Sequence, residues 1–174
     1  MATEPARIRP LLAADLPAYK LLRDAMLEAH PESFTSDAAA ERARPSADYL
    51  QRLGLDRSDG GHFTLGAWLG GEVLAGTISC EREVRTKVAH IGHVVGMMVR
   101  AESRRRGVGA ALLGAGIDRA RRAGIEMLTL SVTASNDEAV QLYERHGFRR
   151  YGRLERALRV GRLYHAKLLM SLSL

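Results

Sequence analysis

The chain has little of several residue types, and each scarcity excludes a class of protein. It has one cysteine, Cys80, in 174 residues, which excludes an internal disulfide and a cysteine-based metal cluster. Aromatic residues make up 5%, and no apolar run approaches the ~20 residues that a membrane-spanning helix needs. Residues 1–5 do not resemble a signal peptide. We therefore expect a cytoplasmic protein with no membrane partner and no metal, with Cys80 as a core residue on a strand.

Lysine is also scarce, so the positive charge of the chain is almost all arginine. The formal net charge is +6 and the isoelectric point is near 10.0, which raises the question of a nucleic-acid partner. The arginines are dispersed along the sequence and are not interleaved with aromatic residues, so we expect no nucleic-acid partner. The length and the 46% hydrophobic content predict one domain over residues 1–174.

A basic segment with two glycines joins an apolar stretch to an amphipathic one. Residues 90–99 are apolar and β-branched, which predicts a strand, and the two glycines within it suggest a bulge or a close backbone approach. From about residue 107 to residue 122, apolar residues recur at three- and four-residue spacings, which predicts a helix. Between them lies Arg104-Arg105-Arg106-Gly107-Val108-Gly109. Such a junction is a place to hold a phosphate.

The start of this helix has the chemistry of an anion site. N–H groups in a first helical turn have no intrahelical partner and lie at the positive end of the helix dipole. Gly107 and Gly109 keep side chains away from an anion, and the three arginines before them add planar donors. A P-loop is excluded because Ala110 and Ala111 follow the last glycine. A dinucleotide fingerprint is excluded because Leu112 stands where Gly or Ala is needed.

A second segment, independent of the first, covers residues 125–148. It predicts a strand over 125–132, a loop with helix-capping residues over 133–137, and a helix over 138–146 that ends at Gly147. Arg-x-x-Gly-x-Gly in the first segment, and Asn-x-x-Ala followed by Leu-Tyr-Glu and Gly-Phe in the second, have a definite order and separation. In these two motifs, and in their order and separation, the chain resembles the GNAT superfamily of acyl-CoA-dependent N-acetyltransferases. The residues of the second motif are Asn136, Ala139, Leu142, Tyr143, Glu144, Gly147 and Phe148.

The resemblance implies a GNAT fold over nearly the whole chain. This is an α/β fold with a mixed sheet of about seven mostly antiparallel strands, splayed between the fourth and fifth, and about four helices. The rest of the sequence agrees with this order. We expect a strand over 6–12, a helix over 15–30 with an apolar face of Leu16, Tyr19, Leu22, Met26 and Ala29, a short helix over 46–53, a hairpin of 62–69 and 72–83 around Gly70-Gly71, and final strands over 148–158 and 163–172.

The resemblance also implies acetyl-CoA as cofactor, with CoA as product. The pantetheine arm is expected on the backbone of the fourth strand, at Met97, Met98 and Val99. Asn136 matches the family residue that contacts the cofactor, and its residue type also suits a helix N-cap. The pyrophosphate is expected on the N–H groups of Arg104, Arg105, Arg106, Gly107, Val108, Gly109 and Ala110.

Two residues are candidates for proton transfer. Tyr143 matches the family tyrosine beside the acetyl sulfur, where a phenol can protonate a leaving thiolate. Several family members place a glutamate on the fourth strand, eleven residues before the first motif, and His93 holds that position in this chain. A histidine, with an ordinary pKa near 6.5, suits a base that acts directly or through a water. His90, Glu81 and Glu83 are the other candidates, as is a water-mediated route without a single base.

The face that His93 shares depends on the regularity of its strand. Simple alternation puts Ile91, His93, Val95, Met97 and Val99 on one face, and a bulge in this strand would change the phase.

The acceptor is not determined by the sequence. The resemblance places it between residues 31–36 and 158–164, and no metal-ligand cluster lies near. A small-molecule primary amine, attacked directly in a ternary complex, is the favoured acceptor. A protein N-terminus or lysine is the alternative acceptor, and a catalytically silent acyl-CoA-binding module is the alternative class. Homodimers are frequent in the family, but the sequence has no decisive interface signal. Glu32, Asp37, Glu41 and Glu155 are candidates to attract a cationic amine, and Phe34 and Tyr164 to form an apolar wall.

Overall fold

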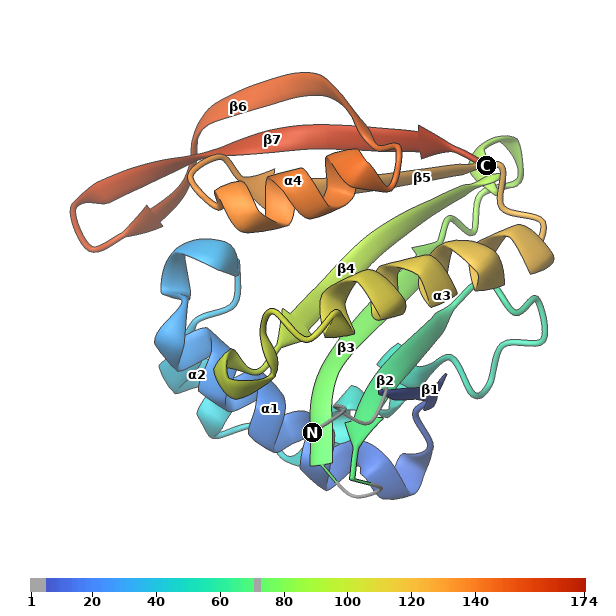
Figure 1. Cartoon of the computed structure of the whole chain (residues 1–174), viewed down its shortest axis with the longest axis horizontal. Coiled ribbons are helices and arrows are strands. Elements are labelled where there is room, and N and C mark those ends of the chain that lie inside the picture. The colour runs from blue at the N-terminus through green and yellow to red at the C-terminus, as the bar shows by residue number, and fades with distance from the viewer. Residues whose placement is uncertain (1–5, 71–72) are drawn as a thin grey trace.

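The computed structural model describes residues 6–70 and 73–174, and the described strands form one seven-stranded sheet (Figure 1). The order across the sheet is β1-β2-β3-β4-β5-β7-β6. All neighbouring pairs are antiparallel except β4 and β5, which are parallel. The mixed, mostly antiparallel sheet that the sequence predicts is therefore confirmed. The strands are β1 (Arg7–Pro10), β2 (Phe63–Leu69), β3 (Val73–Arg82), β4 (Ile91–Val99), β5 (Met127–Thr133), β6 (Arg149–Val160) and β7 (Leu163–Ser173).

Four α-helices and five short 3-10 helices connect the strands within the described ranges. None of these helices is long and apolar enough to cross a membrane. The elements match the expected ones within a few residues, but α2 was not expected, and the predicted turn at Gly70-Gly71 lies partly outside the described residues. The helices are α1 (Leu16–Ala29), α2 (Ala38–Arg42), α3 (Val108–Arg122) and α4 (Asp137–Arg145), with η1 (Ala13–Asp15), η2 (Pro31–Ser33), η3 (Ser46–Leu53), η4 (Thr86–Val88) and η5 (Ala101–Ser103).

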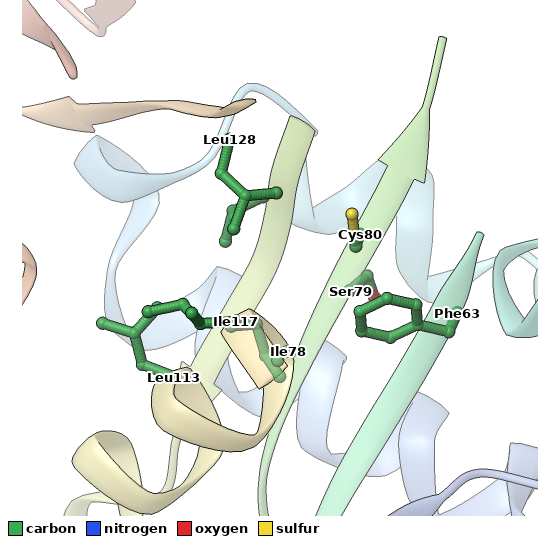
Figure 2. Close-up of a pocket in the computed structure, with 9 residues that line it drawn as sticks. Phe63, Ile78, Ser79, Cys80, Leu113, Ile117 and Leu128 are labelled. Atoms are coloured by element: carbon green, nitrogen blue, oxygen red, sulfur yellow. The ribbon is translucent and has the colours of Figure 1, made fainter. Parts of the chain in front are cut away.

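The main core lies between the sheet and the two helices α3 and α4. Figure 2 shows part of it, where Phe63 and Ile78 of the sheet lie near Leu113 and Ile117 of α3. The gap among these side chains is too small to hold a water molecule. Cys80 lines the same gap, is 3% exposed, and burial raises the pKa of its thiol to about 12. Cys80 is thus an unreactive core residue on a strand, as the sequence predicts.

A second core lies on the opposite face of the sheet, under α1 and η3. Leu16, Tyr19, Leu22 and Met26 of α1 are buried there, as their spacing predicts. Ala29 was also expected on this apolar face, but it is exposed. It occupies the last position of α1, where the helix ends at His30 and no longer follows the sheet.

A buried ion pair ties α1 to the segment that follows it. Arg23 and Glu41 are 3% and 8% exposed, and Arg23 Nε lies 2.9 Å from Glu41 Oε2. The Tyr49 hydroxyl donates to the same carboxylate at 2.6 Å. Burial alone would raise the pKa of Glu41, but the hydrogen bonds from Tyr49 and Arg23 outweigh it and hold that pKa below its ordinary value. The cluster fixes α2 and η3 against α1.

Candidate active site

A cleft opens where β4 and β5 separate. The two parallel strands pair through Ile91 with Met127, Gly92 with Leu128 and His93 with Thr129, and no pair is formed beyond this point. The cleft has a volume of about 540 Å³, within the usual range for small-molecule sites. Its walls come from β4, β5, the start of α3, the start and middle of α4, and the segment after α1. In Figure 1 the separation is visible as the gap that widens from the shared end of β4 and β5.

A bulge in β4 decides which side chains face the cleft. Thr77 of β3 pairs with Met98 and Ser79 pairs with Val95, so β4 has one extra residue between these pairs. Gly96 lies in the bulge with φ of +58°, a conformation that favours glycine. The bulge that the two glycines suggested is therefore present, and it shifts the alternation by one residue, so Ile91 to Val99 do not share a single face. Met97 and Val99 pack towards α3, whereas Met98 is buried in the core under α1.

The start of α3 closes one end of the cleft. Gly107 is its N-cap with φ of +75°, and the N–H groups of Val108, Gly109 and Ala110 belong to the first helical turn. A Cβ built on Gly109 would lie 3.3 Å from Leu142 Cδ2 of α4 and 3.6 Å from Met97 Cε, so the glycine allows a close approach. These groups offer donors and a positive dipole end to an anion, with little side-chain bulk in front of them. The cleft lining includes Arg104, Arg105, Gly107, Val108, Gly109 and Ala110 but not Arg106.

Two contacts connect the segment after α1 to the rest of the cleft. Arg104 Nη2 donates to Nε2 of His30, at the end of α1, over 2.7 Å. The Thr133 hydroxyl, at the end of β5, donates to the carbonyl of Glu32 in η2 over 2.6 Å. His30 and Thr133 were not identified from the sequence as site residues. His30 carried no signal beyond its place before a helix-breaking proline. These contacts hold η2 across the mouth of the cleft.

Tyr143 and Asn136 enter the cleft from α4. The Tyr143 ring packs edge-on against Phe148 at 5.8 Å between centroids, and both Tyr143 and Asn136 line the cleft. Burial raises the pKa of Tyr143 to about 12, so the phenol is protonated at neutral pH. The Asn136 side chain accepts from the Ala139 N–H at 3.2 Å, which makes it the N-cap of α4.

His93 lies at the closed end of the cleft rather than in its lining. Its Nε2 is 3.1 Å from Glu83 Oε1, and its Nδ1 is 2.7 Å from Thr129 Oγ1. A carboxylate only accepts, so Nε2 carries the hydrogen in the neutral imidazole and Nδ1 accepts from the Thr129 hydroxyl. The hydrogen bond from His93 holds the pKa of Glu83 below its ordinary value. Neither neighbour of the imidazole was identified from the sequence as its partner.

Of the four carboxylates that were candidates to attract an amine, one lines the cleft. Glu32 does so together with Ser33 and Phe34. The other three carboxylates do not line the cleft, and each interacts with a structural partner instead. Asp37 accepts from the Ala40 N–H as the N-cap of α2, Glu41 is buried against Arg23 and Tyr49, and Glu155 pairs with Arg153 at 2.5 Å.

A metal site is not indicated by the residues described. Within residues 6–70 and 73–174, no group of three or more histidine, cysteine, aspartate or glutamate side chains is arranged to hold a metal ion.

Comparison with known proteins gives relatives of one kind. The chain is 30% identical over 136 residues to mycothiol acetyltransferase from Propionibacterium freudenreichii, a match that covers 77% of this chain and 40% of that protein. The crystal structure of a GNAT-family acetyltransferase from Streptococcus pneumoniae superposes with a TM-score of 0.82 at 26% identity, covering 97% of this chain and 99% of that one. A putative acetyltransferase from Salmonella typhimurium, solved with its cofactor acetyl-CoA, has a TM-score of 0.83 at 19% identity over 98% and 94% of the two chains.

The family itself follows from a match to a family model. Residues 19–148 match the family described as Acetyltransferase (GNAT) family, and this range contains the opened strands, the start of α3 and Tyr143. The chain spans less than half of the length of the curated mycothiol acetyltransferase that it matches. Since the family match covers most of its 174 residues, the chain belongs to the GNAT family of acetyltransferases.

Proposed function

We propose that the chain transfers the acetyl group of acetyl-CoA to a primary amine and releases CoA. One observation carries this proposal: a single cleft joins the anion-binding start of α3 to the buried phenol of Tyr143, along the separated edge of β4. A small-molecule amine is the favoured acceptor. A protein N-terminus or lysine is the alternative.

The residues of the cleft fit the parts of the cofactor. We assign its pyrophosphate to the first-turn N–H groups of α3 and to Arg104 and Arg105, because Gly107 and Gly109 leave room in front of these donors. We assign the pantetheine arm to the backbone of Met97, Met98 and Val99, on the edge that β5 has left. Asn136 contacts the arm while it caps α4. Acetyl-CoA supplies the activated acyl group.

Tyr143 is the proton donor in this proposal. The attacking amine forms a C–N bond as the C–S bond breaks, and the leaving sulfur takes a proton from the phenol, which regains one from the amine nitrogen. With a pKa of about 12 for Tyr143 and about 8.5 for a thiol, full proton transfer to the free thiolate that leaves the phenol ionised is uphill by roughly 5 kcal/mol. Tyr143 therefore acts by hydrogen bonding to the sulfur as charge develops there, with transfer in step with cleavage.

His93 is the proposed base. The acceptor amine enters as an ammonium ion and must lose one proton before it attacks. Nδ1 of His93 is the nitrogen that can take it, and Nδ1 contacts the hydroxyl of Thr129, its partner in the last pair before β4 and β5 separate. Since neither residue lines the cleft, the proton passes from the ammonium through water to Thr129, as Thr129 passes its own proton to Nδ1.

Thermal unfolding tests the cofactor part of the proposal. At a hundredfold excess over Kd, acetyl-CoA should stabilise the nucleotide-free protein by about 2.7 kcal/mol, which raises the midpoint by roughly 5–10 °C at this chain length. NAD and ATP are the controls, and neither should match this rise. No rise with acetyl-CoA, after bound nucleotide has been removed, contradicts the proposal.

Turnover then separates the alternatives. A panel of free amines and short peptides is assayed for saturable acetylation. Saturation with free amines supports a small-molecule acceptor, and saturation with peptides alone supports a protein acceptor. A rise in the midpoint without turnover of either kind points to the silent acyl-CoA-binding module.

A further inference from the structure

The net charge of the chain is concentrated in one hairpin. Seven of the 26 basic residues and one of the 20 acidic residues lie in 149–167, which leaves 19 of each sign elsewhere. This segment of β6 and β7 therefore carries the whole formal net charge of +6. The expectation of dispersed arginines does not hold for this segment, because Arg149, Arg150, Arg153, Arg156 and Arg159 lie on β6 and Arg162 lies in the turn that follows it.

Most of these charges are not neutralised inside the molecule. Arg150 pairs with Glu144 at 2.8 Å, and Arg153 pairs with Glu155 at 2.5 Å. Within the described residues, four other arginines of the hairpin have no carboxylate within 4.0 Å, and all four are exposed. Surface cations of one sign that lie close together raise the local concentration of anions. The four are Arg149, Arg156, Arg159 and Arg162.

Arg156 has an unusual backbone conformation. Between the pairs Leu154 with Lys167 and Leu158 with His165, three residues of β6 oppose one residue of β7, so Arg156 lies in a bulge. Its φ is +51°, and in the described ranges the only other residue besides glycine with positive φ is Arg105 of the loop before α3. Such a conformation is strained for a residue with a side chain, and strained residues cluster at functional sites. The guanidinium lies 4.0 Å from the centroid of the Tyr164 ring, which holds the side chain in place.

The bulge borders the mouth of the cleft. Leu154, at one end of the bulge, pairs with Lys167 of β7, and Lys167 pairs with Thr133 of β5. Adjacent strands lie about 4.8 Å apart, so the bulge starts roughly 10 Å from Thr133. Thr133 in turn holds the carbonyl of Glu32, and β6 contacts η2 directly. In Figure 1 the hairpin extends beyond the sheet on the side of the segment that follows α1.

From this arrangement we infer that the β6–β7 hairpin, centred on Arg156, binds a negatively charged group of the acceptor, a carboxylate or a phosphate carried beside the amine. The inference rests on the proposed function, because it names the chemical class of the amine substrate. Guanidinium groups suit planar, two-point binding of these anions, and the stacked Arg156 is already ordered for it. The positive hairpin disfavours a polycationic acceptor.

Matched amine pairs test the inference. The pairs are O-phosphoethanolamine with ethanolamine, glutamate with glutamine, and the peptide Ala-Glu-Glu-Ala with Ala-Gln-Gln-Ala. For the pair whose amine the enzyme accepts as substrate, we expect kcat/KM to be at least tenfold higher for the anionic member than for the neutral member. This preference should shrink as the salt concentration rises, because exposed charges are screened. The two small-molecule pairs and the peptide pair distinguish the two sources of the charge.

A variant of Arg156 links the preference to the hairpin. Arg156→Asn removes the guanidinium but keeps a residue type that tolerates positive φ. It should lower kcat/KM for the anionic member about tenfold and leave the neutral member unchanged. Arg121→Gln, on the exposed last turn of α3, removes the same charge from another surface and should change neither.

The outcomes separate this inference from the proposed function. Binding of each anionic member is also measured by calorimetry with CoA in place of acetyl-CoA, so that pairs without turnover are scored as well. Equal binding and turnover of both members, or an unchanged kcat/KM for the anionic member in Arg156→Asn, overturns the inference. If acetyl-CoA still raises the thermal midpoint, the proposed function stands. Tight binding of single-stranded RNA, without any preference within the pairs, also overturns it. No rise with acetyl-CoA overturns the proposed function instead.

Discussion

The imidazole of His93 is held between two side chains, with Nε2 3.1 Å from the carboxylate of Glu83 and Nδ1 2.7 Å from the hydroxyl of Thr129. The three residues come from three segments that meet where β4 and β5 separate. A carboxylate on one nitrogen fixes the tautomer and stabilises the imidazolium that a base becomes. This arrangement favours His93 over the other candidate bases, since Nε2 donates to Glu83 and Nδ1 is left as the nitrogen that can accept a proton.

Replacement of His93 should therefore impair proton removal and leave the cofactor bound. We expect His93→Gln to lower kcat/KM for the amine about 100-fold at pH 7, because general base catalysis typically contributes 10²–10⁴-fold. The Kd for acetyl-CoA, measured by titration, should stay the same. His90→Gln is the matched control, since His90 precedes β4 and is the alternative histidine. A large loss in His90→Gln with none in His93→Gln contradicts the assignment.

Replacement of Glu83 is a second test of the role of His93 as the base. Glu83→Gln replaces a carboxylate, which only accepts, with an amide that can also donate to Nε2 of His93, so the tautomer is no longer fixed and kcat/KM for the amine should fall about tenfold. The other charged groups around His93 are Glu81, its partner in β3, and Arg85, which lies 3.5 Å from Glu83. Glu83→Asp should restore part of the rate. An unchanged kcat/KM in Glu83→Gln shows that the carboxylate is only structural.

Replacement of Tyr143 should affect kcat in a way that does not change with pH. Tyr143→Phe keeps the ring against Phe148 but removes the proton donor, so kcat should fall about 100-fold with an unchanged Kd for acetyl-CoA. Burial raises the pKa of Tyr143 to about 12, so the wild-type phenol stays protonated through pH 10. The ratio of wild-type to variant kcat should therefore be constant from pH 7 to pH 10. Equal kcat values for the two proteins remove Tyr143 from the reaction.

The glycine at the start of α3 allows a matched comparison. Gly109→Val places a side chain within contact of Leu142 and Met97, in front of the first-turn N–H groups, and should weaken acetyl-CoA binding at least tenfold. Gly114→Val is in the same helix, where an added Cβ meets nothing within 4 Å. It should leave the Kd unchanged. Calorimetric titration of both variants decides the point, and equal losses would place the anion elsewhere.

The two sequence motifs were enough to predict the fold, because each fixes a strand, a turn and a helix start in a set order. The element bounds around Gly107 and Asn136 follow from local capping chemistry that the sequence carries. The face of Met97 and Val99 was not predictable, because it depends on which residue of β4 forms the bulge. Two glycines in that strand were candidates, and pairing with β3 selects Gly96.

Interactions between distant residues were also beyond the sequence. Arg23 lies next to Leu22 on the buried side of α1, where a charge is stable only with a partner, and the partner is 18 residues away on a helix too short to be recognised. For this reason Glu41 was interpreted from the sequence as a candidate to attract a cationic amine rather than as the partner of Arg23. The charge of the β6–β7 hairpin, in contrast, could have been counted from the sequence, because its six arginines lie on one strand and the turn after it.

The Arg23–Glu41 pair leads to a prediction about stability. Glu41→Gln leaves Arg23 buried without a counter-charge, and such a loss typically costs 3–5 kcal/mol, so the thermal midpoint should fall by roughly 6–15 °C. Glu28→Gln is the matched control, because Glu28 pairs with Arg42 at 3.0 Å with both side chains exposed, and exposed pairs contribute at most about 1 kcal/mol.

The pH dependence of the two midpoints makes this prediction specific. The pKa of Glu41 is lowered in the folded protein, so its contribution is fully present above the ordinary value of 4.5 and is lost as the pH falls through the folded value. The gap between wild type and Glu41→Gln should therefore be constant from pH 7 to about pH 5 and narrow below pH 4.5. Calorimetric scans over this range measure it. A gap that widens on acidification means that the loss in Glu41→Gln has another origin, because only a carboxylate that is charged in the folded state loses its contribution on protonation.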